Sequence, residues 1–168
     1  AQQKSPKPIK EIFEPKAPTE GNWAKVAVVQ WNPLGPAPLG VTKAEAESVK
    51  QNNRDELALS IREAATNGAE MVITSEFAVV GYPDIPDLPD EEDNFRNKED
   101  VAPYGEAVPG PTTRYFSALA KELKVYIHVG FVEYERATDN YYNTVVAISP
   151  AGTTVAKYRK MHPYKLEY

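Results

Sequence analysis

Two short apolar runs, separated by one long helical segment, constrain the fold of this chain more than any other feature. The first run is KVAVVQW at residues 25–31, and the second is EMVITSE at residues 70–76. Short apolar runs rich in β-branched residues are typical of buried strands. The order strand, helix, strand predicts that the second strand lies parallel to the first. We expect the 25–31 strand to be central in its sheet.

The segment between the two runs carries helix signals at both ends. Thr42 and Glu45 have the spacing of a capping box, and a second helix start at Asn53 is equally compatible with the pattern. Gly68 stands where a helix-ending glycine belongs. Apolar side chains gather on one face at helical spacing, namely Leu57, Ile61, Ala64 and Ala65. A helix that packs on a sheet is therefore predicted here.

The rest of the chain predicts a second helix and three further strands. Residues 111–124 have the pattern of an amphipathic helix, and residues 125–135 that of a strand. Residues 141–160 predict a hairpin with the turn Ser-Pro-Ala-Gly, in which Pro150 suits the first corner. Strands and helices that alternate in this way indicate a mixed α/β class, with the helices on one sheet face. The other face of such apolar strands must also be buried, which suggests a second sheet from elsewhere.

Two segments are expected to lack regular structure. Residues 1–22 are rich in proline and lysine and predict an extended arm, so we place the domain at residues 23–168. Residues 83–100 carry eight acidic and two basic residues and predict an irregular loop, which either forms a lid or is merely solvated. The chain begins with Ala1, as chains do after signal-peptide removal, although trimming explains this equally well. The localisation is thus open, and the mature-looking N-terminus favours a secreted or periplasmic protein.

Composition removes several classes of function. The net charge of −5 argues against a nucleic-acid-binding surface, which needs clustered basic residues. No apolar run approaches the roughly 20 residues of a membrane span. The chain contains no cysteine and only two histidines, His128 and His162, so thiolate and His-rich metal sites are excluded within these residues. We expect no metal, no nucleic-acid partner and no membrane partner.

Two strand ends carry residues suited to catalysis. Glu76 ends the second apolar run, at the sheet edge where ligands bind in open α/β folds. The apolar residues after it are expected to desolvate its carboxyl group and raise its pKa, as suits a general acid or base. Lys160 is the last residue of the predicted hairpin. It lies on the same strand face as Tyr158, whereas Arg159 points to the opposite face. An inward ammonium group needs a carboxylate partner, and Glu76 is the candidate. Solvated strand ends are the alternative interpretation of both residues.

Four segments in register resemble the nitrilase superfamily of carbon–nitrogen hydrolases. GAEMVITSEFAVVGYP at residues 68–83 is similar to the glutamate motif of that family, and YYNTVVAISPAGTTVAKYRKMH at residues 141–162 is similar to its lysine motif. KVAVVQWNP looks like its first strand, and residues 108–131 look like the helix and strand before the hairpin. The resemblance implies a four-layer αββα sandwich, of which this chain supplies the N-terminal portion.

The resemblance also implies an active site of one glutamate, one lysine and one cysteine. The matching motifs assign the glutamate to Glu76 and the lysine to Lys160, and the cysteine is expected beyond the end of this chain. The chain alone is therefore expected to be inactive and to require the C-terminal part of the same hydrolase domain. Glu167 is a possible second acid, and Tyr82 and Asn143 are candidate substrate-binding residues.

The implied reaction is hydrolysis of a linear amide, carbamoyl or nitrile substrate through a thioester, with no cofactor. A homo-oligomer is also expected, because members of this family often assemble through faces of the sandwich. Ser75 and Pro163 depart from the family pattern, in which proline and leucine are common at these positions. Two alternatives stay open. One is a binding or regulatory relative without a nucleophile, and the other is a metal-dependent phosphoesterase that uses Asn32 and Glu76.

Overall fold

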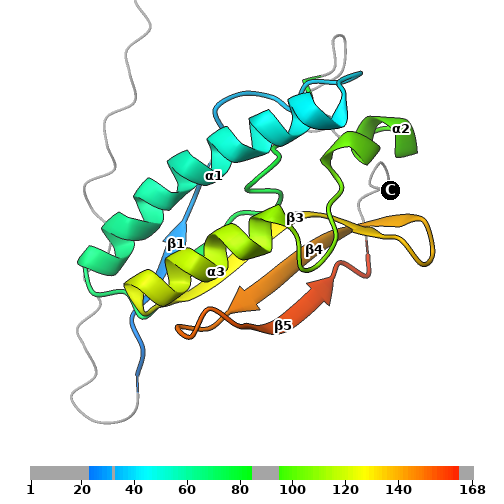
Figure 1. Cartoon of the computed structure of the whole chain (residues 1–168). Coiled ribbons are helices and arrows are strands. Elements are labelled where there is room, and N and C mark those ends of the chain that lie inside the picture. Colours follow the sequence, from blue (N-terminus) through cyan, green and yellow to red (C-terminus); the bar gives the residue numbers. More distant parts are fainter. Residues whose placement is uncertain (1–22, 32, 85–94, 163–168) are drawn as a thin grey trace, which may run out of the picture.

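The computed structural model describes residues 23–31, 33–84 and 95–162 (Figure 1). Its elements in chain order are β1 (Val26–Val29), α1 (Lys43–Thr66), β2 (Met71–Thr74), α2 (Lys98–Val101), the 3-10 helix η2 (Ala102–Tyr104), α3 (Pro111–Leu123), β3 (Tyr126–Glu135), β4 (Asn140–Ile148) and β5 (Thr154–Arg159). The predicted arm at residues 1–22, together with Asn32, Pro163 and Glu167, lies outside the described residues.

The five strands form one mixed sheet in the order β1-β2-β3-β4-β5. β1, β2 and β3 run parallel, and β4 and β5 follow as antiparallel neighbours. The predicted parallel unit and the predicted hairpin are thus confirmed. The prediction that the first strand is central is wrong, because β1 pairs only with β2 among the described strands. An apolar run cannot distinguish these cases, since both a central strand and an edge strand can carry apolar residues on two faces.

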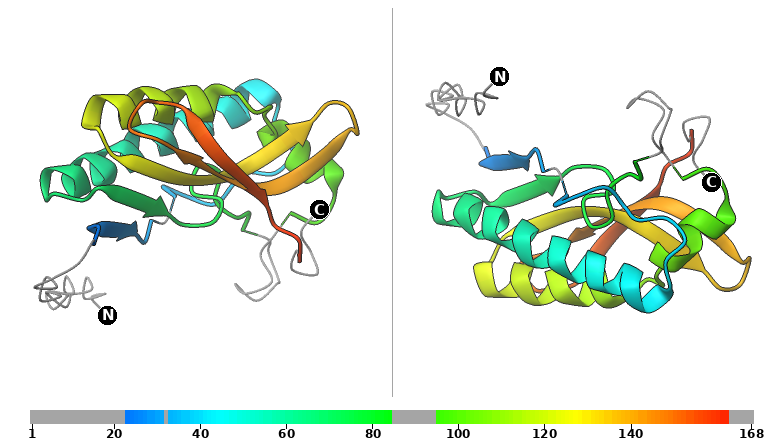
Figure 2. Two further views of the ribbon diagram at one scale, coloured as in Figure 1. Left: turned by 90° about the horizontal axis from the view of Figure 1, so that it is seen from below. Right: turned by 90° about the horizontal axis from the view of Figure 1, so that it is seen from above.

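α1 and α3 cover one face of this sheet, as the two views of Figure 2 show. The core between helices and sheet contains fully buried side chains from both layers, including Leu57, Ile61, Val72, Phe116, Ile127 and Ile148. On the opposite sheet face Val28 is 74% exposed and Tyr158 is 53% exposed. The α/β class is confirmed, and the described residues supply one helix layer and one sheet layer with an apolar face left open.

Local signals at its two ends explain why α1 is one continuous helix. The Thr42 hydroxyl accepts a hydrogen bond from the Glu45 backbone N–H, and the Glu45 carboxylate accepts one from the Thr42 N–H, so the capping box is confirmed. The alternative start at Asn53 is wrong, because Asn53 is buried within the helix and its amide donates to the Val79 carbonyl. Gly68 follows with a φ of 84°, a left-handed conformation that glycine adopts without strain.

The turn between β4 and β5 sets the register of the hairpin. The Gly152 N–H donates to the Ser149 carbonyl at 2.8 Å, with Pro150 at the predicted first corner. In the acidic segment, residues 85–94 lie outside the described residues. The irregular-loop prediction is wrong at the end of that segment, where Asn97 caps α2 by accepting from the Asp100 N–H at 2.9 Å.

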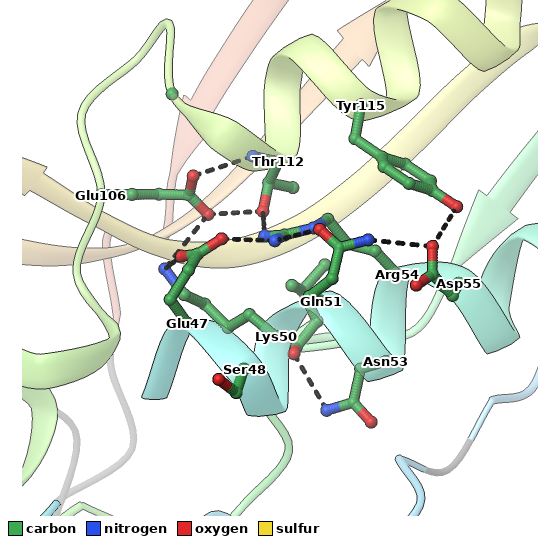
Figure 3. A network of polar contacts seen from close by, with 12 residues as sticks. Glu47, Ser48, Lys50, Gln51, Asn53, Arg54, Asp55, Glu106, Thr112 and Tyr115 are labelled. Atoms are coloured by element: carbon green, nitrogen blue, oxygen red, sulfur yellow. Dashed lines mark hydrogen bonds and ion pairs between the residues drawn. The ribbon is translucent and has the colours of Figure 1, made fainter. Parts of the chain in front are cut away.

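A buried polar network joins α1 to the start of α3 (Figure 3). The Glu106 carboxylate accepts from the Thr112 backbone N–H at 2.8 Å and from the Thr112 hydroxyl at 2.5 Å. Lys50 Nζ lies 3.8 Å from the same carboxylate and donates to the Tyr104 carbonyl at 3.1 Å. Arg54 donates to the Thr112 hydroxyl at 3.2 Å. The three charged side chains are almost fully buried, so each depends on its partners for compensation.

Candidate active site

Glu76 lies just beyond the end of β2, where the chain turns sharply. Phe77 has a φ of 47°, in the left-handed region that residues other than glycine rarely adopt. The turning backbone lies against Gly130 of β3: a Cβ added there would stand 3.1 Å from the Ser75 carbonyl oxygen and 3.2 Å from the Phe77 nitrogen. The bare Cα of Gly130 therefore makes room for the segment that carries Glu76. Sequence reasoning missed this role, although a lone glycine in an apolar strand was the available signal.

Lys160 follows β5 directly and continues its ladder. Its backbone N–H donates to the Asn143 carbonyl on β4 at 2.9 Å. The predicted alternation is confirmed, because Tyr158 and Lys160 line one pocket whereas Arg159 donates to Glu133 on the other face of the sheet. The register of the hairpin thus decides that a lysine, and not an arginine, faces the pocket.

Glu76 and Lys160 form an ion pair, as the sequence predicts. Lys160 Nζ lies 2.9 Å from Glu76 Oε1, and Asn143 Nδ2 donates to the same oxygen at 2.5 Å. About 43% of the Glu76 side chain and 31% of the Lys160 side chain are exposed. A pocket of about 270 Å³ opens beside them, lined by Thr74, Ser75, Glu76, Gly130, Asn143, Val145, Tyr158 and Lys160. The site therefore lies on the open sheet face, away from the helices.

The pKa of Glu76 lies below its usual value, which corrects the prediction of a raised pKa. Burial raises this pKa, but hydrogen bonds from Lys160 and Asn143, the positive charge of Lys160 and a hydrogen bond from Tyr82 outweigh the burial. The apolar neighbours of Glu76 can be seen in the sequence, whereas the donors Lys160 and Asn143 reach it only through the fold of the β4–β5 hairpin. The carboxylate is consequently ionised at neutral pH, the state in which it can accept a proton.

The two residues predicted to bind substrate both lie at the Glu76 carboxylate. Asn143 donates to it directly, and Tyr82 contributes a hydrogen bond that lowers its pKa. The Tyr82 ring packs against Phe77, with the ring centroids 5.3 Å apart. A role of these residues toward substrate stays a prediction, and the possible second acid, Glu167, lies outside the described residues.

No group of three or more His, Cys, Asp or Glu side chains within residues 23–31, 33–84 and 95–162 is placed to hold a metal ion. Asn32, which the phosphoesterase alternative requires, lies outside these ranges. In the same part of the chain, no helix has the length and apolar character that crossing a membrane requires.

Behind the site, Glu133 anchors β5 from the opposite sheet face. Glu133 is 3% exposed and accepts hydrogen bonds from Thr144 at 2.7 Å, from Lys157 at 2.6 Å and from Arg159 at 2.9 and 2.7 Å. The Arg159 guanidinium also lies 3.9 Å from the centre of the Tyr142 ring. Burial raises the pKa of Glu133, but these hydrogen bonds and the charge of Lys157 lower it to about 2. Sequence reasoning missed Glu133, although a glutamate within an apolar strand was a usable signal.

Acid should weaken this anchor. Because the pKa of Glu133 falls from 4.5 to about 2 on folding, its contribution to stability is complete above pH 4.5 and is lost as the pH falls toward 2. We expect Glu133→Gln to lower the free energy of unfolding at pH 7 by about 2–3 kcal/mol and to flatten its pH dependence below pH 5. Urea unfolding of the complete protein at a series of pH values measures both. An unaltered pH dependence in the variant would contradict the assignment, and Glu122→Gln, at an exposed ion pair, serves as the control.

Residues 25–168 match the family model of the carbon-nitrogen hydrolases. The chain is 31% identical over 129 residues to omega-amidase NIT2 of Homo sapiens, an alignment that covers 77% of this chain and 41% of that protein. It is 34% identical over 119 residues to the bifunctional nitrilase/nitrile hydratase NIT4A of Lupinus angustifolius, covering 64% of this chain and 32% of the relative. This chain thus spans less than half the length of either relative.

The fold is similar to that of Saccharomyces cerevisiae Nit3, a member of branch 10 of the nitrilase superfamily. The TM-score is 0.61 at 21% identity, and the similarity covers 83% of this chain and 44% of Nit3. The resemblance predicted from the motifs around Glu76 and Lys160 is therefore confirmed at the level of family and fold. The chain belongs to the carbon–nitrogen hydrolase family.

Proposed function

We propose that the protein hydrolyses an amide C–N bond, with Glu76 transferring protons and Lys160 stabilising the developing oxyanion. The observation that carries the proposal is the ion pair between these side chains beside one pocket. Membership of the carbon–nitrogen hydrolase family supports the same chemistry. A carboxylate and an ammonium group still lack a nucleophile, and these 168 residues contain no cysteine. We infer that a cysteine beyond Tyr168 supplies it.

The proposed reaction begins with proton transfer from the cysteine thiol to Glu76, because the thiolate is the nucleophilic form. The thiolate attacks the carbonyl carbon, and the negative charge that develops on the oxygen is stabilised by Lys160, a type of contact typically worth about 3 kcal/mol. The C–N bond then breaks as Glu76 returns its proton to the leaving nitrogen. Water next loses a proton to Glu76 and attacks the thioester, the C–S bond breaks, and the sulfur recovers a proton.

The ionised state of Glu76 is consistent with the first of these steps. A carboxyl group that is already protonated at neutral pH cannot accept a proton from a thiol. The low pKa of Glu76 keeps its side chain ionised, so it can act as the base. Lys160, in turn, sits against a charge that is neutralised when Glu76 is protonated. Its ammonium group is then freed for the oxyanion at the step that needs it.

The open sheet face supports the proposed partner, the C-terminal part of the same hydrolase domain. Val28 and Tyr158 are 74% and 53% exposed there, and apolar surface of this kind is normally covered. The pocket lies on the same face, so the segment that covers the sheet can also deliver the cysteine. We further propose, as the family resemblance suggests, that the complete protein forms a homo-oligomer and that Glu167 acts as a second acid.

For the substrate, we propose a small molecule with a primary amide at the end of a short chain. The similarity to an omega-amidase supports this class, and the similarity to a nitrilase/nitrile hydratase keeps a nitrile open as the alternative. A carbamoyl group offers the same electrophilic carbon. Tyr82, at the edge of the carboxylate, is the proposed substrate contact.

The decisive experiment expresses the complete coding region and measures ammonia release from dicarboxylic acid monoamides, matching carbamoyl compounds and nitriles. We expect turnover that iodoacetamide abolishes and that EDTA leaves unchanged, because the nucleophile is a thiolate and no metal takes part. The 168-residue chain, assayed in parallel, should be inactive. Sensitivity to EDTA alone would contradict the proposal and favour the phosphoesterase alternative.

The second candidate is a non-catalytic binding or regulatory relative, favoured by the absence of cysteine from these 168 residues. Intact-mass analysis of the native protein separates the two. A native mass of 18.6 kDa with no companion chain would favour the non-catalytic relative. A larger mass, or a companion chain that carries a cysteine, is the result that the hydrolase proposal requires.

A further inference from the structure

Asn143 contacts both candidate catalytic residues, with two different groups. Its side-chain Nδ2 donates to Glu76 Oε1 at 2.5 Å, and its main-chain carbonyl accepts from the Lys160 backbone N–H at 2.9 Å. Glu76 and Lys160 are 84 residues apart in the chain and leave the sheet from β2 and β5. Asn143, on β4, thus links the ends of two strands that lie far apart in the sequence.

Two of the donors that orient the Glu76 carboxylate meet at its oxygen Oε1. Lys160 Nζ reaches this oxygen at 2.9 Å and Asn143 Nδ2 at 2.5 Å. A carboxylate oxygen has lone pairs for two such donors, so Lys160 and Asn143 together satisfy Oε1. Lysine is a long, flexible chain that ends in a point charge, whereas asparagine is short and its amide is directional. The Asn143 amide is therefore better suited than the Lys160 ammonium group to set the orientation of the Glu76 carboxylate.

Gly130 of β3 stands between β4 and the backbone that carries Glu76. Gly130 pairs with Val145 in the β3–β4 register and lines the same pocket as Asn143 and Glu76. A Cβ at Gly130 would press on the backbone around Glu76, as described above. The glycine therefore lets the backbone that carries Glu76 lie close to β3, with Glu76 within reach of the Asn143 amide.

We propose that Asn143 is a positioning residue, whose side-chain amide fixes the Glu76 carboxylate while its main-chain carbonyl fixes the start of the segment that carries Lys160. This inference rests on the proposed function and extends it. Without the amide, Glu76 keeps its ion pair with Lys160 and its hydrogen bond with Tyr82, but its carboxylate is held less precisely. Proton transfer then slows while substrate binding is little affected, because transfer depends steeply on placement.

Asn143→Leu in the complete protein tests this, because leucine has a similar size, lacks a donor and leaves the main-chain carbonyl in place. We expect kcat for a monoamide substrate to fall by about 10–100-fold, with KM within about threefold of the wild-type value. Among residues 23–31, 33–84 and 95–162, the titratable groups that act on Glu76 are Lys160 and Tyr82, and both remain in this variant. The acidic limb of the kcat/KM profile should move to higher pH, because a carboxylate that loses a donor is protonated more readily.

Asn143→Asp covers the case in which the leucine variant does not fold. It is nearly isosteric and places a second carboxylate at Glu76, so the acidic limb should move further toward high pH than in the leucine variant. Asn140→Leu is the matched control: it removes an exposed amide at the first residue of β4 and should leave kcat and the pH profile unchanged.

Three results would overturn the inference. They are a wild-type kcat in Asn143→Leu, a loss confined to KM, which would assign Asn143 to substrate binding, and a pH profile of Asn143→Asp that superposes on the wild type. Glu76→Gln separates this inference from the function on which it rests. If Glu76→Gln is inactive and Asn143→Leu is not impaired, only the positioning role fails. If Glu76→Gln is fully active, the proposed function fails.

Discussion

Glu76→Gln and Lys160→Ala, each made in the complete protein, are expected to abolish turnover while leaving the fold intact. Glutamine has nearly the shape of glutamate and can still accept from Asn143 and Lys160, but it cannot take up a proton. We expect kcat to fall by about 10³-fold or more for Glu76→Gln, and by about 10²–10³-fold for Lys160→Ala, which removes the oxyanion partner. Both residues are partly exposed, so neither change should cost much stability.

Steady-state ammonia release and circular dichroism measured on the same samples check this prediction. Glu122→Gln and Lys121→Ala make the matching chemical changes on the exposed surface of α3 and should keep wild-type rates. Near-wild-type turnover in either the Glu76 or the Lys160 variant would refute the assignment of that residue. Loss of the helical signal would instead indicate a structural effect, and the iodoacetamide test would then decide the mechanism.

Glu106→Ala is expected to give the largest loss of stability. The substitution leaves Lys50 and Arg54 buried with fewer partners and leaves the Thr112 N–H without its acceptor at the start of α3. Breaking a buried charge network by removing one member typically costs about 3–5 kcal/mol. Glu47 still lies 3.0 Å from Lys50, which places the expected cost in the lower half of that range.

Chemical denaturation of the complete protein measures this cost. Glu122→Ala removes one partner of an exposed ion pair with Arg62 and should cost less than about 1 kcal/mol. Glu106→Gln keeps an acceptor for Thr112 and removes only the charge, so it should fall between the two. A Glu106→Ala variant as stable as the Glu122→Ala variant would show that the buried network does not stabilise the fold.

Much of the fold follows from local patterns in the sequence. The capping box at Thr42, the glycine at position 68 and the turn at Pro150 all act through neighbouring residues, and the structure has them as predicted. The position of β1 at the sheet edge does not follow, because pairing depends on strands far away in the chain. The role of Asn53 does not follow from local patterns either, since its amide donates to the carbonyl of Val79, which lies in the segment after β2.

For the candidate site, the sequence predicts which residues meet but not how they are held. Glu76 and Lys160 end their strands, and alternation along β5 turns the lysine toward the pocket. The low pKa of Glu76 depends on donors from Lys160, Asn143 and Tyr82, which only the folded sheet brings together. The clearance at Gly130 likewise requires knowing that the chain turns over β3 at that point.

The two faces of β5 present different functional residues, and this limits where the chain can accept insertions and deletions. One side of the strand presents Lys160 to the pocket, and the other presents Arg159 to Glu133. A codon added to or deleted from the turn around Pro150 would exchange these sides, because strand side chains alternate with a period of two residues. Arginine would then enter the pocket and lysine would leave it. Indels compatible with activity should therefore accumulate in other loops, and this hairpin should keep a constant length.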